Sequence, residues 1–329
     1  MKVSKLSLVL IGMGLCASAS AEPWKFVVFG DTRSASTGDN KGVYVSILGE
    51  LANRTVAEGA KFVLVPGDLV YQGSFSGAFS QWKTTMAPVY NASIGVYPIM
   101  GNHDTSGAAA WNTAFGADIP DNGPTGETNR TYSFSYNNAF VVGLDNYVTS
   151  HRVNQTWLDA QFAANTKPHV FVFGHEPAFK ANHTDCLDDY PTNRNAFWAS
   201  IAAEGGRSYF AGHDHLYAHA RIGDGDGDPN DDVHQFIVGP NTIPSAYHTS
   251  LNYDGVNSPY SPVDVAKEFS TPGYMVVTVD GDNVTMEWKH RVGANSYATL
   301  DTFSYVVPEP ASLGVLAIGA IGLLIRRRS

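Results

Sequence analysis

The sequence predicts an α/β protein whose core is a two-layer mixed β-sandwich flanked by helices. Five short apolar segments each end at a glycine that is followed by a residue able to bind a metal. Helical periodicity occurs between several of these segments, whereas the last third of the chain has the alternating pattern of β-strands. Strands that alternate with helices and are followed by further strands are typical of layered α/β folds.

The five apolar segments are the expected central strands. They cover residues 24–29, 61–65, 96–100, 169–173 and 209–211. Glycine lets the backbone turn sharply where a strand ends. In open α/β sheets, functional sites gather beyond the carboxyl ends of the strands. We therefore expect the polar residues after these strands to lie close together.

The remaining elements are expected to complete the same core. Helices are predicted over residues 43–57, 155–164 and 196–203, and strands over 217–222, 234–238, 274–280 and 284–289, with a turn at 281–283. These later strands could complete a second sheet. We find no internal repeat and no linker that would divide the chain, so residues 22–306 are expected to form one domain.

The N-terminal residues have the pattern of a signal peptide. Lys2 and Lys5 precede an apolar run at 6–15, and Ala19-Ser20-Ala21 provides a small-residue cleavage site. An uncleaved anchor is the alternative, but the apolar run is short for one. We predict a signal peptide over residues 1–21 and export of the protein.

The C-terminal residues have the pattern of a second sorting signal. Pro308-Glu309-Pro310 is followed by an apolar stretch at 311–325 and three arginines at 326–328. At ~1.5 Å per residue, this stretch is short for the ~30 Å core of a bilayer. The order resembles the PEP-CTERM sorting tail of bacterial surface proteins. The resemblance implies that an exosortase-type enzyme recognises and removes residues 307–329, leaving a periplasmic, cell-surface or matrix protein; a permanent anchor is the alternative.

Composition and charge restrict the partners that the protein can bind. Hydrophobic residues make up 43% of the chain and charged residues 16%, as in globular proteins. The formal net charge is −10, and loss of both terminal segments would remove two lysines and three arginines. Such a surface does not suit a nucleic acid polymer.

Cys186 would be the only cysteine left after removal of the signal peptide, so no intrachain disulfide is expected.

Five motifs carry the expected chemistry. They are GDTR at 30–33, GDLVY at 67–71, GNHD at 101–104, GHEP at 174–177 and GHDH at 212–215. Carboxylate, amide oxygen and imidazole are ligands of hard and borderline metal ions, and two neighbouring metals need a shared ligand. Each motif is a weak signal by itself. Together and in this order they resemble the calcineurin-like metallophosphoesterases over nearly the whole domain.

That resemblance implies a two-metal site. It assigns Asp31 and His215 to the first metal and Asp68 to a bridge between both metals. It assigns the second metal to Asn102, His175 and His213. The expected cofactors are therefore two metal ions.

One position departs from the common pattern. Most members of the family carry a histidine ligand where this sequence has Arg33, which cannot bind a metal. Tyr71, three residues after Asp68, resembles the tyrosine that binds ferric iron in purple acid phosphatases. This resemblance implies Fe(III) at the first site, with Fe, Zn or Mn at the second. The alternative is that Tyr71 is a core aromatic and that Arg33 binds phosphate beside a single metal.

The same resemblance implies the catalytic roles. His103 would bind phosphate and protonate the leaving oxygen, and Asp104 would orient its ring or strengthen its hold on the proton. Arg33 could contact an equatorial phosphate oxygen. A polar loop pair without a catalytic role is the alternative for His103 and Asp104.

The expected function is hydrolysis of phosphomonoesters by in-line attack of a hydroxide generated at the metals. A phosphodiesterase or nucleotidase using the same site is one alternative. A non-catalytic matrix protein that retains the fold is the other.

Two further features remain outside these motifs. Asp224, Asp226 and Asp228 resemble the start of a calcium loop, but the later positions of an EF-hand are missing, so a solvated acidic hairpin tip is the favoured interpretation. Four isolated histidines are expected to have ordinary surface or core roles: His183, His219, His234 and His248.

Overall fold

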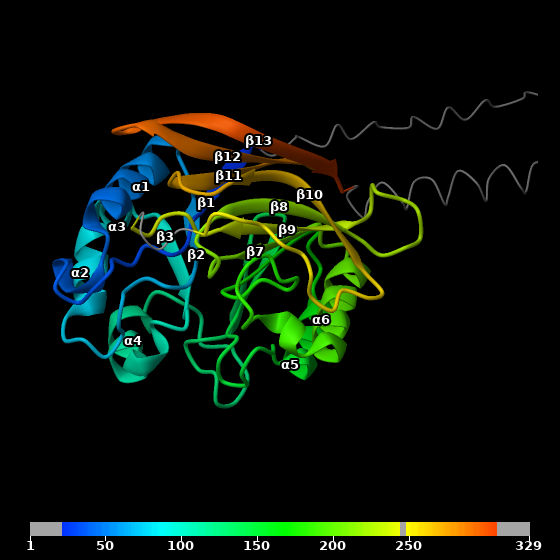
Figure 1. Ribbon diagram of the computed structural model, residues 1–329, viewed down its shortest axis with the longest axis horizontal. Coiled ribbons are helices and arrows are strands. Elements are labelled where there is room, and N and C mark those ends of the chain that lie inside the picture. Colours follow the sequence, from blue (N-terminus) through cyan, green and yellow to red (C-terminus); the bar gives the residue numbers. More distant parts are fainter. Residues whose placement is uncertain (1–21, 244–247, 308–329) are drawn as a thin grey trace, which may run out of the picture.

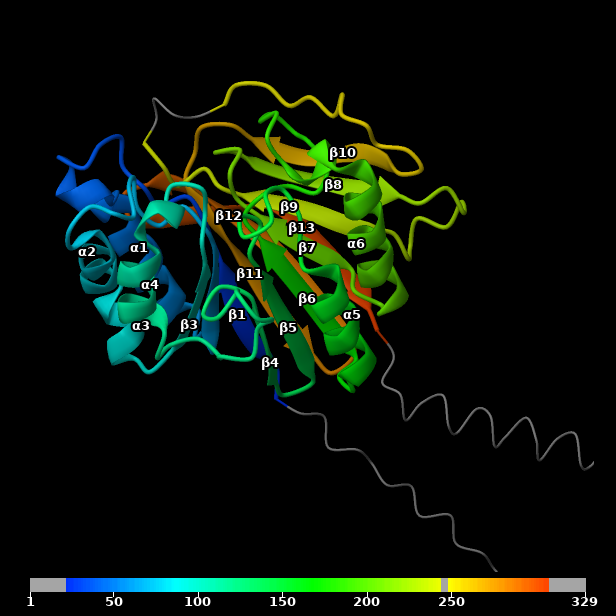
Figure 2. The same cartoon turned by 90° about the horizontal axis from the view of Figure 1, so that it is seen from below.

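The computed structural model describes residues 22–243 and 248–307. The predicted signal peptide and residues 308–329 of the predicted tail lie outside these residues. Within them, two β-sheets pack face to face and helices cover the outer face of each sheet (Figures 1 and 2). The predicted two-layer core flanked by helices is therefore confirmed.

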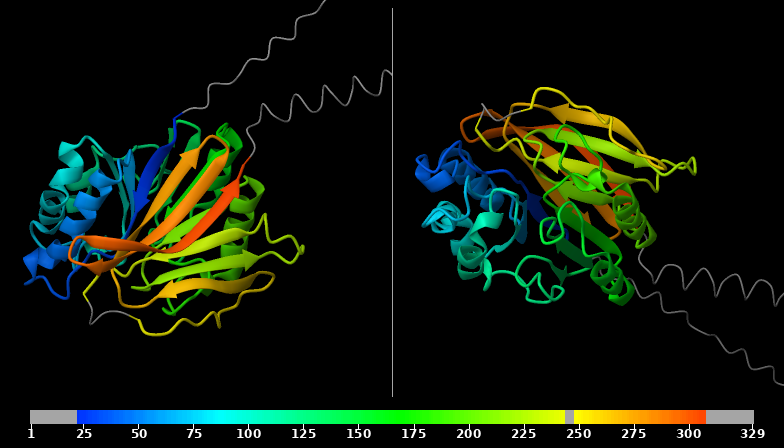
Figure 3. Two further views of the ribbon diagram at one scale, coloured as in Figure 1. Left: turned by 90° about the horizontal axis from the view of Figure 1, so that it is seen from above. Right: turned by 60° about the horizontal axis from the view of Figure 1, so that its bottom comes forward.

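The first sheet has the strand order β13-β12-β11-β1-β2-β3. Its strands are β1 (Trp24–Val28), β2 (Phe62–Pro66), β3 (Gly95–Ile99), β11 (Gly273–Asp280), β12 (Asn283–Gly293) and β13 (Ser296–Val306). Strands β1, β2 and β3 are parallel, and β11 pairs antiparallel with β1. Figure 3 shows β11, β12 and β13 running side by side on the β1 side of this sheet.

The second sheet has the strand order β10-β8-β9-β7-β6-β5-β4. Its strands are β4 (Tyr132–Tyr136), β5 (Ala139–Leu144), β6 (His169–Gly174), β7 (Ser208–Ala211), β8 (Tyr217–Gly223), β9 (Val233–Val238) and β10 (Ser261–Glu268). Strands β5, β6, β7 and β9 are parallel to one another.

The helices form two groups. They are α1 (Val45–Ala57), α2 (Ala78–Thr85), α3 (Ala87–Asn91), α4 (Ala108–Phe115), α5 (Gln155–Ala164) and α6 (Pro191–Ala203), with short 3-10 turns η1 (Asn40–Gly42), η2 (Thr105–Gly107) and η3 (Leu187–Asp189). Helices α1 to α4 share a hydrophobic cluster with the first sheet, and α5 and α6 share another with the second sheet.

Aromatic side chains fill the space between the sheets. Phe26 of β1 stacks on Phe62 of β2 at 4.8 Å between ring centroids, and Phe171 of β6 meets Phe26 edge-on at 4.9 Å. All three side chains are almost completely buried. Such pairs contribute beyond the burial of their area, by about 0.5–1.5 kcal/mol each. This packing fixes the two sheets relative to each other, and with them the loops at the strand ends.

The structure corrects the expected arrangement of the C-terminal strands. Of the four strands expected to complete a second sheet, β8 and β9 do so, whereas β11 and β12 extend the first sheet. Strands β10 and β13 were not predicted, since their side chains are mostly exposed or half-buried and include many polar residues. Helices α2 to α4 were missed because they are short, at five to eight residues.

In the described part of the chain, no helix combines the length and the apolar character needed to cross a membrane.

Candidate metal centre

The five motifs meet where the parallel strands end. Asp31 follows β1, Asp68 follows β2, and Asn102 follows β3 in the first sheet. His175 follows β6, and the GHDH turn follows β7 in the second sheet. Asp31, Asp68 and His175 are fully or almost fully buried, and each offers one ligand atom within 4.8 Å of the others. The two sheets therefore contribute candidate metal ligands to one site.

The turns that carry the ligands have unusual backbone conformations. Four of the expected ligands have positive φ: Asp31 at 55°, Asp68 at 53°, His213 at 71° and His215 at 48°. Non-glycine residues adopt this region rarely, and such strain clusters at functional sites. The neighbouring glycines permit the close approach, since a Cβ at Gly101 would overlap the Asp68 carboxylate.

Backbone carbonyls fix the orientation of His175. Its Nδ1 lies 2.8 Å from the Pro66 carbonyl oxygen, which can only accept, so Nδ1 carries the proton. Its Nε2 then presents a lone pair 3.2 Å from Oδ1 of Asn102 and 3.5 Å from Oδ1 of Asp68. A backbone carbonyl that holds one ring nitrogen and leaves the other free for a metal is the usual support of a metal-bound histidine.

His213 is held in the same way through its other nitrogen. Its Nε2 lies 2.9 Å from the backbone oxygen of Asp185, so Nε2 is the donor and Nδ1 retains a lone pair. The backbone N–H of His213 donates to the Asp31 carboxylate at 3.0 Å. Its ring centroid lies 5.1 Å from that of His175. The structure therefore brings together three predicted ligands of the second metal with Asp68: Asn102, His175 and His213.

The predicted first site contains Asp31, Asp68 and His215, with Arg33 beside them. Nε2 of His215 lies 3.5 Å from Oδ1 of Asp31. Arg33 donates through Nε to Oδ2 of Asp68 at 3.2 Å, and its Nη2 lies 3.4 Å from Nε2 of His215. The guanidinium thus lies against two of the expected ligands, and it brings positive charge to the edge of the centre.

The ionisable groups of the centre perturb one another strongly. Burial and the neighbouring Asp68 carboxylate raise the pKa of Asp31 well above its usual value. Burial also raises the pKa of Asp68, but its electrostatic interactions with His175, His103 and the Arg33 guanidinium outweigh that effect and hold the pKa below its usual value. Burial lowers the pKa of His175 to about 4, which favours the neutral ligand form.

The donor set fits metal ions. Two buried carboxylates at adjacent positions repel each other, and a cation between them removes that repulsion. The surrounding donors are an amide oxygen and imidazole lone pairs, which suit first-row transition metals. On these grounds the residues of this site are suited to hold metal.

Tyr71 and His103 lie together beside Arg33. Their ring centroids are 5.5 Å apart, and the Arg33 guanidinium carbon lies 5.9 Å from the Tyr71 ring. Nδ1 of His103 lies 2.6 Å from the Tyr71 backbone oxygen, so it donates and Nε2 remains available to a substrate. Both side chains are half-buried.

The expected contact between Asp104 and the His103 ring is wrong. The Asp104 carboxylate is fully buried and accepts backbone N–H groups of Leu69 at 3.2 Å, Val70 at 3.2 Å and Gly101 at 2.9 Å. Burial and the nearby Asp68 carboxylate raise the pKa of Asp104 to about 8, although these three donors lower it. Asp104 therefore joins the second and third motif loops, and the Tyr71 carbonyl orients His103.

Replacement of Asp104 by alanine should destabilise the protein and loosen the metal centre. It would leave three buried N–H groups unpaired, at about 1–3 kcal/mol for each group. Chemical denaturation should show a lower midpoint, and the metal content of the folded protein should fall. Asp121→Ala, at an exposed carboxylate, is the control. Unchanged stability in Asp104→Ala would contradict this structural role.

The acidic hairpin between β8 and β9 has the geometry of a solvated turn. Asp224, Asp226 and Asp228 each accept the backbone N–H two residues further along, at 2.7–3.0 Å. Their side chains are exposed. Oxygens that are turned to their own backbone favour the hairpin interpretation over a calcium loop.

The isolated histidines divide into two pairs. His219 and His234 are buried between the sheets, hydrogen-bonded to each other at 2.7 Å, and His219 also contacts Asp301. They have the ordinary core role that was predicted. His183 and His248 instead lie beside the metal centre, since the ring centroid of His183 is 4.3 Å from that of His213 and the ring centroid of His248 is 5.9 Å from that of His215. Sequence reasoning missed this pair because neither histidine follows a strand and glycine.

Comparisons with known proteins agree with this geometry. The calcineurin-like phosphoesterase profile matches residues 25–217, and the PEP-CTERM protein-sorting motif matches residues 306–328. A comparison with curated protein sequences gave no significant match.

Similar solved structures share the fold at low sequence identity. A purple acid phosphatase from yellow lupin (Lupinus luteus) has a TM-score of 0.65 and 15% identity over 87% of this chain, which spans 54% of the lupin chain. GAP50, the anchor in the inner membrane complex of Plasmodium, has a TM-score of 0.60 and 13% identity over 87% of this chain and 89% of its own. A dimetal phosphatase from Danio rerio has a TM-score of 0.54 and 14% identity over 87% of this chain and 99% of its own.

The profile covers more than half of the sequence, and its residues include all five motifs that converge at the strand ends. The chain therefore belongs to the calcineurin-like phosphoesterase family.

Proposed function

We propose that the protein is a secreted or surface-sorted phosphatase that uses two metal ions to hydrolyse phosphomonoesters. The observation that carries the proposal is the convergence of the buried Asp31, Asp68 and His175 side chains at the shared edge of the two sheets. Apart from the position of Arg33, the ligand positions expected of the family carry residues able to bind a metal, which argues against a matrix protein whose site has decayed.

Seven residues would hold the two ions. Asp31, Asp68, Tyr71 and His215 would bind the first, and Asp68, Asn102, His175 and His213 the second. When bound, the ions would offset the charge of the phosphate and promote deprotonation of a nucleophilic water. A phenolate is a hard anionic ligand, so Tyr71 would favour a trivalent ion such as Fe(III) at the first site, with Fe, Zn or Mn at the second.

The protein's own residues would position the ester and move the proton. Nδ1 of His103 is held by the Tyr71 carbonyl, which leaves Nε2 to give a proton to the departing alkoxide oxygen. The guanidinium of Arg33 lies against Asp68 and His215, where it would donate to an equatorial phosphate oxygen. Asn102 is exposed, so the second metal would be open to substrate.

A panel of substrates tests the proposal. The purified, metal-loaded protein should hydrolyse phosphomonoesters with a higher kcat/KM than matched phosphodiesters or nucleoside polyphosphates. Faster hydrolysis of diesters or nucleotides would instead support the phosphodiesterase or nucleotidase alternative. If the protein holds two metals and hydrolyses none of these esters, the matrix-protein alternative is supported.

Tyr71→Phe tests the ferric site. Ferric phenolate gives charge-transfer absorption in the visible range, so the iron-loaded protein should be coloured and the variant colourless. The variant should also bind the first metal more weakly, whereas the second should change little because Asn102, His175 and His213 are intact. Absorption spectra and metal analysis of both proteins provide the measurement.

The conservative control for this experiment is Tyr44→Phe, at another half-buried tyrosine of the same half of the chain. It should keep both colour and metal content. If the wild-type protein holds two metals, one of them shown to be ferric, and is colourless, the assignment of Tyr71 as a ligand is wrong.

Export and processing of the tail follow from the two terminal sequences. We propose that an exosortase-type enzyme removes the tail and that the protein then resides in the periplasm, at the cell surface or in the matrix. Mass spectrometry should show that the surface-exposed protein lacks Arg326 to Arg328. Retention of these residues would favour a permanent anchor.

A further inference from the structure

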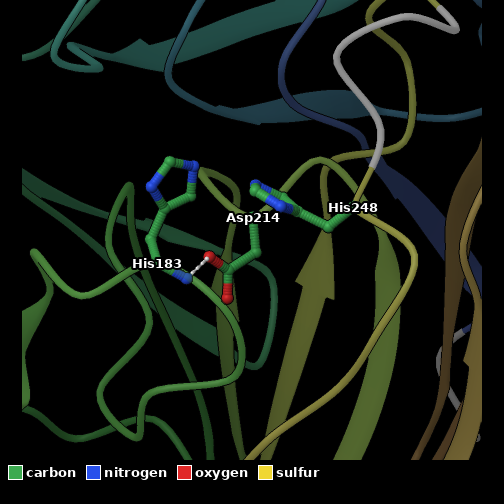
Figure 4. A group of neighbouring side chains, drawn as sticks. All are labelled: His183, Asp214 and His248. Atoms are coloured by element: carbon green, nitrogen blue, oxygen red, sulfur yellow. Dashed lines mark hydrogen bonds between the residues drawn. The ribbon is translucent and has the colours of Figure 1, made fainter.

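A second cluster of potential metal ligands lies beside the centre described above. His183 comes from the segment between β6 and η3, Asp214 from the GHDH turn after β7, and His248 from the segment between β9 and β10. One ligand atom from each of the three lies within 4.8 Å of the others. Figure 4 shows the two imidazoles near each other, with the Asp214 carboxylate below them and hydrogen-bonded to the backbone N–H of His183.

Asp214 is a buried carboxylate that needs positive charge. It is fully buried, and it accepts the backbone N–H of His183 at 2.8 Å through Oδ1 and that of Asn182 at 3.0 Å through Oδ2. Each carboxylate oxygen has a second lone pair. No lysine or arginine forms a salt bridge with Asp214 in the residues that the structure describes. A bound cation would offset the cost of burying this charge.

The two imidazoles are arranged to complete such a site. Nδ1 of His183 lies 3.4 Å from Oδ1 of Asp185, which leaves Nε2 as the ring nitrogen for a metal. A carboxylate that supports the other nitrogen is common for metal-bound histidine. Nε2 of His248 is buried and has no hydrogen-bond partner in the described part of the chain. The ring centroids of His183 and His248 are 4.6 Å apart.

We propose that His183, Asp214 and His248 bind a third metal ion, a borderline divalent cation of the zinc type. Two imidazoles and one carboxylate are a usual donor set for zinc, with a fourth position left for water or a ligand. None of the three residues is a ligand of the proposed pair. The His183 ring nevertheless lies 4.3 Å from that of His213, so the third ion would add positive charge beside a bound phosphate ester.

Zinc stoichiometry tests the proposal without relying on activity. The purified protein, stripped of metal and dialysed against Zn²⁺, should bind three ions per chain, and His248→Ala should bind two. His290→Ala, at a half-buried histidine on β12, is the matched control and should bind three. Asp68→Asn should lose the pair and keep the third ion, which separates failure of this site from failure of the proposed function. A wild type that binds two ions at saturation, or a His248→Ala variant that still binds three, would overturn the proposal.

Anomalous diffraction at the zinc edge gives a test that does not depend on the folding of a variant. Crystals of the wild-type protein grown with Zn²⁺ should show a peak about 2.0–2.2 Å from one atom each of His183, Asp214 and His248. Peaks at Asp68 without one at this cluster would refute the third site and leave the two-metal proposal intact.

Discussion

Asp68→Asn is expected to lose both metals of the pair and nearly all hydrolysis. In the structure Asp68 is 1% exposed, and its oxygens contact Nε of Arg33, Nε2 of His175 and the backbone N–H of His103. One shared carboxylate sets the spacing of two metals, and the amide of asparagine cannot supply its charge. Metal ions contribute several kcal/mol to such reactions, and about 1.4 kcal/mol is tenfold in rate, so the loss should be roughly 10³-fold or more.

Metal analysis and single-substrate kinetics check this expectation. Asp121→Asn is the matched control, since Asp121 is exposed and lies outside the centre. The control should keep wild-type metal content and rate. Full occupancy of both metal positions in Asp68→Asn would remove the assignment of Asp68 as the bridge.

His103→Ala is expected to slow hydrolysis without a loss of metal. The ring is held through Nδ1 by the Tyr71 carbonyl, and its Nε2 is free of that contact. A general acid typically contributes about 10²–10⁴-fold, and an activated aryl leaving group needs less of this assistance. Esters with poor leaving groups should therefore slow by about that factor, whereas aryl esters should slow much less.

The test measures the rates of the wild type and of His103→Ala on alkyl and aryl phosphate esters, together with the metal content of both proteins. His290→Ala should behave as the wild type on both classes, because His290 lies on β12, in the C-terminal part of the first sheet. Equal slowing of alkyl and aryl esters by His103→Ala would count against proton transfer. It would point instead to a role of His103 in binding the phosphate.

Local sequence was sufficient to find the strand-end residues that lie together in the candidate metal centre. Apolar runs predicted β1, β2, β3, β6 and β7, and the residue after each following glycine lies at the common edge of the two sheets. The convergence could be predicted because each strand, its glycine and the polar residue after it are neighbours in the chain. A short peptide segment then fixes both the turn and the direction in which its polar side chain leaves the sheet.

Asp104 shows where local reasoning failed. Its position next to His103 indicated a catalytic partner, but its carboxylate points to the N–H groups of Leu69, Val70 and Gly101. Two of those donors lie more than thirty residues away in the sequence. A sequence does not show which distant backbone donors a buried carboxylate will meet.

By itself, the sequence determined the layered fold, the family and the order of the candidate ligand residues along the chain. Only the tertiary structure decided how the C-terminal strands divide between the sheets, which nitrogen of His175 and of His213 faces the centre, and that His183 and His248 meet at Asp214. The physical reason is the distance along the chain over which each interaction acts. Strand periodicity and glycine turns act within a few residues, whereas sheet pairing, imidazole orientation and the meeting of three loops depend on groups far apart in the chain.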